Sequence, residues 1–183
     1  MWVYGHFGNE LNTNTLMKRW LWLSLIIFLL DQATKWLVMG ALAPYETIEL
    51  IPNLNLTLAF NTGAAFSFLA DAGGWQRWGL AALALVISGV LAAWLLRLRA
   101  DERTMAVALA LIIGGAVGNL VDRVVLGHVI DFIQIYLPWV PFALFNPWPA
   151  FNVADSAISL GVVILLVHTL FFDTGTDRPA MKA

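Results

Sequence analysis

The chain has 183 residues, of which 60% are hydrophobic and only 12% are charged, and it contains no cysteine. Soluble domains carry about 25% charged residues, so this composition excludes an ordinary water-soluble core and favours a membrane protein. The absence of cysteine excludes disulfides, thiolate metal sites and a cysteine nucleophile. The net charge of −2 provides no basic surface for nucleic acid.

Four apolar runs follow a polar, Asn- and Thr-rich tail at residues 1–16. The runs are residues 20–41, 78–96, 104–121 and 156–172. About 20 mostly apolar residues cross a bilayer as a helix, and all seven prolines fall outside these runs. The sequence therefore predicts a membrane-embedded, all-α core of four transmembrane helices. They form one domain at residues 17–172, followed by a tail at residues 173–183.

Basic residues indicate how these helices are oriented. Seven of the ten Lys and Arg residues flank the predicted helices on the same side of the membrane. They are Lys18, Arg19, Arg97, Arg99, Arg103, Arg178 and Lys182. Basic residues accumulate on the cytoplasmic side of membrane proteins. We therefore expect both termini in the cytoplasm and two larger segments, residues 42–77 and 122–155, on the outer face.

The two outer segments have different patterns. Alternate residues from Leu54 to Phe60 are apolar, as in a half-buried strand, and residues 47–51 are expected to pair with it across a turn at residues 52–53. Residues 132–151 contain seven aromatic side chains and no charge, which favours a position on the lipid interface. The sequence thus predicts a small β-sheet and an interfacial flap on the outer face.

Asp31 and Lys35 lie four residues apart, on one face of the first predicted helix. A charge deep in the bilayer needs a partner, so the two residues form either a structural ion pair or a functional pair. In the functional case the protein would be a small four-helix transporter that uses Asp31 and Lys35 for ion coupling.

Polar and small residues gather at the outer end of the third predicted helix. Gly114 and Gly118 are typical of close helix packing. Asn119, Asp122 and Arg123 place polar groups at the outer end, where they can support a site.

Two carboxylates, Asp131 and Asp155, are predicted at the same depth on the outer face. Taken alone, Asp155 would be the N-cap of the fourth helix. If the two meet, they cannot both ionise cheaply, and one holds a proton while the other deprotonates a water molecule. A metal site formed by these two residues with Asp122 and His128 would be rich in oxygen. We expect neither a metal nor a cofactor.

Five motifs, in this order, resemble bacterial lipoprotein signal peptidases (signal peptidase II), which are aspartic peptidases of the inner membrane. The motifs are Asp31–Lys35, Asn61–Ser67, Gly118–Arg123, Val129–Phe132 and Phe151–Ser156. The resemblance covers nearly all of residues 17–172 and implies that Asp131 and Asp155 are the catalytic pair. It also implies supporting or substrate-binding roles for eight matching positions. These are Asp31, Lys35, Asn61, Gly63, Asn119, Asp122, Arg123 and Asn152.

The resemblance further implies a function: removal of the signal peptide from diacylglyceryl-modified prolipoproteins by a cut before the lipid-modified cysteine. The expected partners are these substrates and membrane lipid, without nucleic acid. We expect a monomer in the bacterial inner membrane with its active site at the periplasmic face. The outer sheet would be the substrate cradle, and residues 132–151 a mobile outer helix region.

The alternative classes of protein differ in which charged residues they require for function. A transporter would require Asp31 and Lys35 and tolerate the loss of the outer carboxylates. A peptidase requires Asp131 and Asp155, and a structural membrane subunit would tolerate the loss of either pair.

Overall fold

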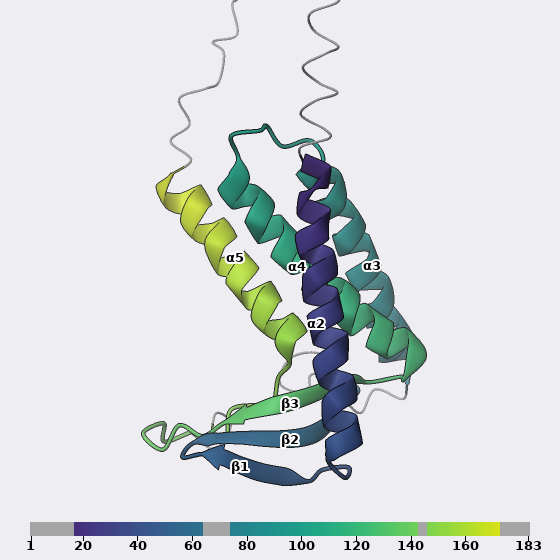
Figure 1. Ribbon diagram of the computed structural model, residues 1–183, viewed down its shortest axis with the longest axis vertical. Coiled ribbons are helices and arrows are strands. Elements are labelled where there is room, and N and C mark those ends of the chain that lie inside the picture. The colour runs from purple at the N-terminus through teal and green to yellow at the C-terminus, as the bar shows by residue number, and fades with distance from the viewer. Residues whose placement is uncertain (1–16, 64–73, 143–145, 173–183) are drawn as a thin grey trace, which may run out of the picture.

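The computed structural model describes residues 17–63, 74–142 and 146–172, so the predicted tails at residues 1–16 and 173–183 lie outside the described residues. The elements in chain order are α2 (Trp20–Ala41), β1 (Thr47–Ile51), β2 (Leu54–Asn61), α3 (Trp75–Leu95), α4 (Arg103–Val125), β3 (Val129–Ile135) and α5 (Val153–Phe171). The helices form a bundle, and the sheet lies across one end of it (Figure 1). The start of α2 and the end of α5 both lie at the opposite end of the bundle.

The predicted helices are confirmed: within the described residues, four helices are long and apolar enough to cross a membrane. The ends of α2 coincide with the prediction, but the sheet-facing ends of the other helices do not. Helix α3 begins at Trp75 rather than at residue 78, α4 continues to Val125 rather than ending at 121, and α5 begins at Val153 rather than at 156. The added turns carry Arg77, Asp122 and Asp155, and the structure keeps them helical because neighbouring helices bind their side chains.

Helix α4 is the central helix of the bundle and the most deeply buried of the four. Two of its glycines lie where a side chain would collide with α2. A Cβ atom on Gly114 would lie 2.6 Å from the backbone oxygen of Ser24, and one on Gly118 would lie 2.5 Å from Oδ2 of Asp31. The close helix packing predicted for these glycines is therefore confirmed, and at Gly118 it leaves room for the carboxylate of Asp31.

The sheet has three antiparallel strands in the order β1-β2-β3. The predicted pairing of β1 with β2 is confirmed, and the turn between them contains Asn53 with a φ of 72°. Strand β3 was not predicted. Its pairing with β2 is irregular between Leu56 and Ala59, and beyond this point Ala59 lies opposite Asp131. The end of β2 is thereby brought beside the carboxylate of β3.

The segment after β3 differs from the outer helix that the resemblance implied. Residues 136–142 and 146–152 contain no helix, and residues 143–145 lie outside the described part of the chain. The returning segment instead pairs with the sheet through a bridge between Phe151 and Ile133. Four prolines interrupt this stretch, and proline removes a backbone donor and disfavours a helix. They are Pro138, Pro141, Pro147 and Pro149.

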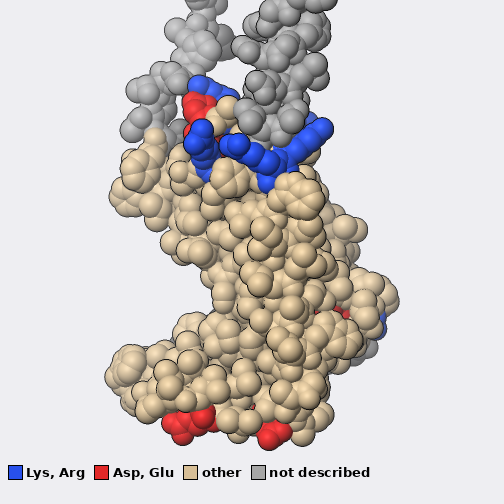
Figure 2. All heavy atoms as spheres, viewed as in Figure 1, with Lys and Arg blue, Asp and Glu red and all other residues tan. Residues whose placement is uncertain are grey.

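Charged residues are distributed unevenly along the bundle. Figure 2 shows Lys and Arg gathered at the end opposite the sheet, with acidic side chains on the sheet itself. Among the described residues, exposed basic side chains at that end come from the start of α2 and from the α3–α4 connection. These are Lys18, Arg19, Arg97, Arg99 and Arg103.

Candidate functional site

A cavity of about 630 Å³ lies between the sheet and the sheet-facing ends of α4 and α5. Both predicted carboxylates line it, Asp131 from β3 and Asp155 from α5, together with Asn61, Asn119 and Arg123. Figure 2 shows the molecule hollowed between the helices and the sheet on the side of α5. The remaining wall is largely apolar, so the cavity combines a few polar groups with an apolar lining, as ligand-binding sites commonly do.

Asp131 is held by amide groups on both of its oxygens. The side-chain nitrogen of Asn61 donates to Oδ2 at 3.0 Å, and that of Asn152 donates to Oδ1 at 2.8 Å. The side chain is only 3% exposed. Burial, and then the neighbouring charge of Asp155, raise the pKa of Asp131 from its ordinary 3.8 to about 7. Near neutral pH this carboxyl therefore holds a proton in a large fraction of the molecules.

Asp155 is the third residue of α5 and is not its N-cap. Asn152 caps the helix: its Oδ1 accepts from the backbone N–H of Asp155 at 2.8 Å, and Oδ2 of Asp155 accepts from the backbone N–H of Asn152 at 3.2 Å. This reciprocal pair is a capping box. The other oxygen of Asp155 accepts from Nδ2 of Asn119 at 2.8 Å. The N-cap alternative considered for Asp155 is therefore wrong.

Asn152 connects the two carboxylates. It is fully buried, and its side-chain nitrogen lies 2.8 Å from Asp131 Oδ1 and 3.2 Å from both Asn119 Oδ1 and the backbone oxygen of Ile130. The same residue binds Asp155 through its side-chain oxygen and its backbone nitrogen. A single side chain thus fixes the position of Asp131 relative to Asp155.

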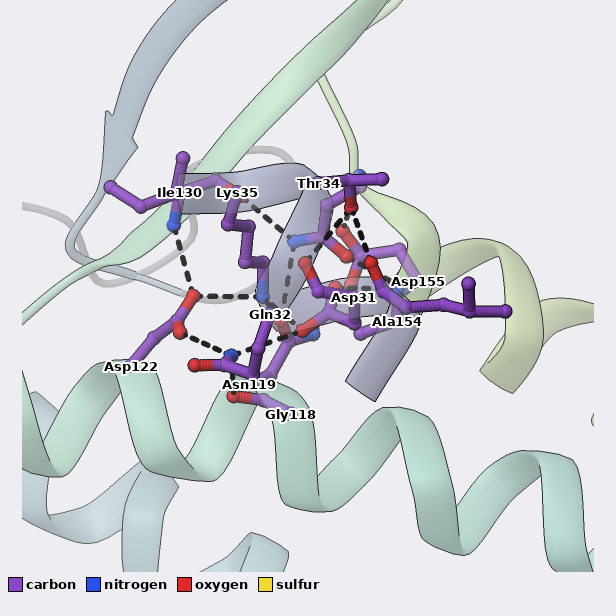
Figure 3. Close-up of polar contacts among 12 residues, drawn as sticks. Asp31, Gln32, Thr34, Lys35, Gly118, Asn119, Asp122, Ile130, Ala154 and Asp155 are labelled. Atoms are coloured by element: carbon purple, nitrogen blue, oxygen red, sulfur yellow. Dashed lines mark hydrogen bonds and ion pairs between the residues drawn. The ribbon is translucent and has the colours of Figure 1, made fainter. Parts of the chain in front are cut away.

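A buried charge network lies behind this pair and consists of Asp31, Lys35 and Asp122. The Nζ atom of Lys35 lies 2.8 Å from Oδ2 of Asp31 and 2.7 Å from Oδ2 of Asp122 (Figure 3). It also donates to Oδ1 of Asn119 at 3.0 Å. This contact orients the amide of Asn119 so that its nitrogen faces Asp155. The predicted ion pair between Asp31 and Lys35 is therefore confirmed, with Asp122 as a second carboxylate partner that the sequence did not reveal.

Gln32 belongs to this network and was not among the predicted site residues. Its side-chain nitrogen donates to Asp122 Oδ1 at 2.8 Å and to Asp31 Oδ2 at 3.2 Å. The other oxygen of Asp31 accepts from the backbone N–H of Ala154 at 2.9 Å, which ties α2 to the first turn of α5. The only sequence signal for Gln32 was its place beside Asp31, since the side chain it meets is 90 residues away.

Arg123 links the end of α4 to the end of β2. Its Nη2 donates to the backbone oxygen of Gly63 at 2.9 Å, and its Nη1 to that of Asn119 at 3.2 Å. The backbone N–H of Gly63 in turn donates to Oδ1 of Asn61 at 3.0 Å. This orients the amide nitrogen of Asn61 toward Asp131. All eight predicted supporting residues and the two carboxylates therefore belong to one connected network, although residues 64–67 of the second motif lie outside the described part of the chain.

His128 lies apart from the cavity. It packs edge-on against Phe60, with ring centroids 4.7 Å apart, and burial lowers its pKa. Within the described ranges, no group of three or more His, Cys, Asp or Glu side chains is arranged to hold a metal ion. The polar groups that line the cavity include two carboxyls, two side-chain amides, one guanidinium and the hydroxyls of Ser156 and Ser159, which suits acid–base chemistry on water.

The raised pKa of Asp131 leads to a testable effect of pH on stability. Folded Asp131 keeps its proton between pH 3.8 and about 7, where the unfolded chain has already lost it, so wild-type stability falls as the pH rises through this range. Asp131→Asn carries no such ionisation. The measured quantity is the Tm of Asp131→Asn minus the Tm of wild type, from thermal unfolding in detergent. We expect this difference to be larger at about pH 8 than at about pH 5. Parallel curves for the two proteins would contradict this explanation, and the exposed Asp101→Asn serves as the control.

The helices of the bundle are long enough to cross a membrane, and a cavity at one end holds two neighbouring carboxyls. This arrangement is typical of membrane-embedded enzymes that activate water by acid–base chemistry. A family model described as signal peptidase (SPase) II matches residues 23–171. The chain belongs to the signal peptidase II family, and it is a protease.

Similar proteins agree with this assignment. A lipoprotein signal peptidase of Pseudomonas putida is 57% identical over 147 residues, which cover 80% of this chain and 83% of the relative. A lipoprotein signal peptidase of Ectopseudomonas mendocina is 54% identical over 162 residues, covering 88% and 93%. A solved bacterial membrane enzyme matches with a TM-score of 0.74 at 27% identity, covering 90% of this chain and 95% of that one. The family expected from the motifs is confirmed, and the transporter alternative is not supported.

Proposed function

We propose that this peptidase removes the signal peptide from diacylglyceryl-modified prolipoproteins by cutting the bond before the lipid-modified cysteine. The relatives that are 52–57% identical are named lipoprotein signal peptidases, which supports this substrate class. The observation that carries the proposal is the placement of Asp131 and Asp155 in one cavity, with Asn152 binding both.

The two carboxyls divide the chemistry between them. Two neighbouring buried carboxyls cannot both ionise cheaply, so one of them holds a proton in the resting enzyme. We assign this proton to Asp131, whose pKa burial raises to about 7, and the role of general base to Asp155. Asp155 takes a proton from water, and the resulting oxygen nucleophile attacks the carbonyl carbon of the scissile bond. Asp131 gives its proton to the carbonyl oxygen. Collapse of the tetrahedral intermediate then breaks the C–N bond. The proton held by Asp155 passes to the departing amine, and a hydroxyl of the intermediate returns a proton to Asp131, which leaves the carboxyl product and the resting enzyme.

The surrounding residues hold this pair in place. The side-chain amides of Asn61, Asn119 and Asn152 each donate to one of the two carboxylates. The buried charge network fixes Asn119 through Lys35, and Arg123 fixes Asn61 through Gly63. We assign these residues positioning roles, because a displacement of about 1 Å at a reacting group can cost about a hundredfold in rate.

The shape of the site suits a substrate anchored in lipid. The cavity wall includes Trp148, Pro149 and Phe151 from the aromatic segment and Ile158 from α5, all without charge. Acyl chains can remain in the bilayer beside α5 while the peptide reaches the carboxylates. The sheet forms the floor of the cavity through Ala59 and Phe60, which supports its expected role as a substrate cradle.

The charge distribution supports an orientation in the bacterial inner membrane. The exposed basic residues lie at the end of the bundle where α2 begins and α5 ends (Figure 2). By the positive-inside rule this end faces the cytoplasm, with both termini. The sheet, the aromatic flap and the carboxylates then lie at the periplasmic face.

The proposal predicts that cleavage depends on the substrate lipid. Acyl chains confine the substrate to the membrane and raise its effective concentration at the site, so their removal should lower kcat/KM by at least about a hundredfold. The measurement compares initial rates on one prolipoprotein with and without its diacylglyceryl group, in the same detergent–lipid mixture. Equal values of kcat/KM would instead indicate a peptidase that reads the peptide alone.

A further inference from the structure

Arg77 lies at the start of α3, outside the cavity, and has no role in the function described above. Its Nε atom donates to the backbone oxygen of Arg123 at 2.6 Å, and its Nη2 to that of Val124 at 2.7 Å. The guanidinium also lies 4.6 Å from the centre of the Trp78 ring, which covers one of its faces. Arg77 thus joins α3 to the last turn of α4.

These two carbonyl groups need an external donor. The last four carbonyls of a helix have no partner within the helix. In α4, the N–H groups of Leu126 and Gly127 both bind the carbonyl of Asp122, at 2.7 and 3.1 Å. Arg77 supplies donors to the next two carbonyls, and its positive charge also suits the C-terminal end of a helix. Arginine fits this position because its rigid fork presents several donors at once, whereas lysine offers a single ammonium group.

The turn that follows α4 also fits around Arg77. Gly127 has a φ of +89°, and a Cβ atom there would lie 3.2 Å from Nη1 of Arg77. Glycine at this position therefore allows both the backbone conformation and the close approach of the guanidinium. Strand β3, which carries Asp131, begins two residues later at Val129.

The turn held by Arg77 carries the side chain that reaches β2. Arg123 donates to the backbone oxygen of Gly63, Gly63 donates to Asn61, and Asn61 donates to Oδ2 of Asp131 at 3.0 Å. A continuous path of short polar contacts therefore runs from Arg77 to one oxygen of Asp131. The start of α3 and the end of β2 are both anchored to the same residue of α4, the first through its backbone and the second through its side chain.

We propose that Arg77 is a positioning residue of the peptidase site, which fixes the last turn of α4 and through it the hydrogen bond from Asn61 to Asp131. This inference rests on the proposed role of Asp131. Loss of the Arg77 contacts releases the turn that holds Arg123. Asn61 then spends less time aligned with Asp131, which slows the chemical step and leaves lipid binding at the cavity largely unchanged.

The test is a double-mutant cycle on the full-length enzyme in detergent, with a lipid-modified prolipoprotein as substrate. The variants are Arg77→Gln, Asn61→Ala and the two combined. We expect Arg77→Gln to lower kcat per folded enzyme by roughly tenfold with KM within about twofold. If Arg77 acts through Asn61, the combined variant will have the kcat of Asn61→Ala within about twofold. Arg77→Lys should recover part of the rate, and Arg97→Gln, an exposed arginine at the opposite end of the bundle, should behave as wild type.

Other results would overturn the inference. One is an unchanged kcat per folded enzyme in Arg77→Gln, even with a lowered Tm. The other is a kcat of the combined variant that falls by the product of the two single-variant decreases. If Arg77→Gln does not fold, Arg77→Lys takes its place in the cycle and is judged by the same two criteria. Failure of the proposed function is recognised separately, by activity in Asp131→Asn, because every enzyme in the cycle keeps both carboxyls.

Discussion

Asparagine in place of either Asp131 or Asp155 is expected to abolish cleavage, lowering kcat by at least about 10³-fold, while the protein still folds. The reaction needs one group that gives a proton and one that takes it, and an amide does neither at neutral pH. Folding should persist because asparagine has nearly the same shape and keeps one acceptor oxygen. At position 131 this oxygen can still accept from Asn152, and at position 155 from Asn119.

The measurement is single-turnover cleavage of a lipid-modified prolipoprotein by purified enzyme, with thermal unfolding as the check on folding. Asp101→Asn is the matched control, because Asp101 is exposed and pairs with the nearby Arg99 at the opposite end of the bundle. It should retain the wild-type rate. Near wild-type turnover in either the Asp131 or the Asp155 variant would remove the paired-carboxylate mechanism. Activity in only one of them would reduce the proposal to a single acid or base.

The helices and the hairpin were predictable because their signals are local. A run of about 20 apolar residues or a period-two alternation can be recognised without knowing what packs against it. Strand β3 gave no such signal. Its residues Val129, Ile130 and Phe132 are buried, as is Asp131 between them, so apolar residues point to both faces and the alternation is lost.

The candidate site was predictable as a set of residues but not as a set of contacts. The motifs placed Asp31 with Lys35, and Asn119 with Asp122, because each pair shares a helix. The contact between Lys35 and Asp122 depends on how α2 packs on α4, which Gly118 permits but does not specify. Asn152 illustrates the same limit. Asp155 and Asn152 are both good N-cap residues. In the structure Asn152 caps the helix by accepting from the backbone N–H of Asp155, and the Asp155 side chain lies one turn further along, beside Asn119.

The buried charge network gives the largest expected effect on stability, at Lys35→Met. Lys35 is 1% exposed, and its two carboxylate partners, Asp31 and Asp122, are 0% and 3% exposed. Methionine fills a similar volume but leaves two carboxylates facing each other without a cation. Breaking a buried pair by removing one partner costs about 3–5 kcal/mol, and here two partners lose their cation. We expect a sharply lowered Tm in detergent and little folded protein, while the exposed Lys18→Met should match wild type.

The contact with Asp122 also determines which second change restores stability. If Asp31 and Lys35 formed an isolated pair, removing both charges would leave nothing uncompensated, and that double variant would recover most of the lost stability. In this structure the double variant Lys35→Met/Asp31→Asn still leaves Asp122 without its cation. Lys35→Met/Asp31→Asn/Asp122→Asn removes all three charges, and asparagine at 122 keeps an oxygen that can accept from Gln32. We expect this triple variant to unfold at a higher temperature than Lys35→Met and than Lys35→Met/Asp31→Asn. If Lys35→Met/Asp31→Asn recovers as much stability as the triple variant, Asp122 does not depend on Lys35, and the network reduces to the pair on α2.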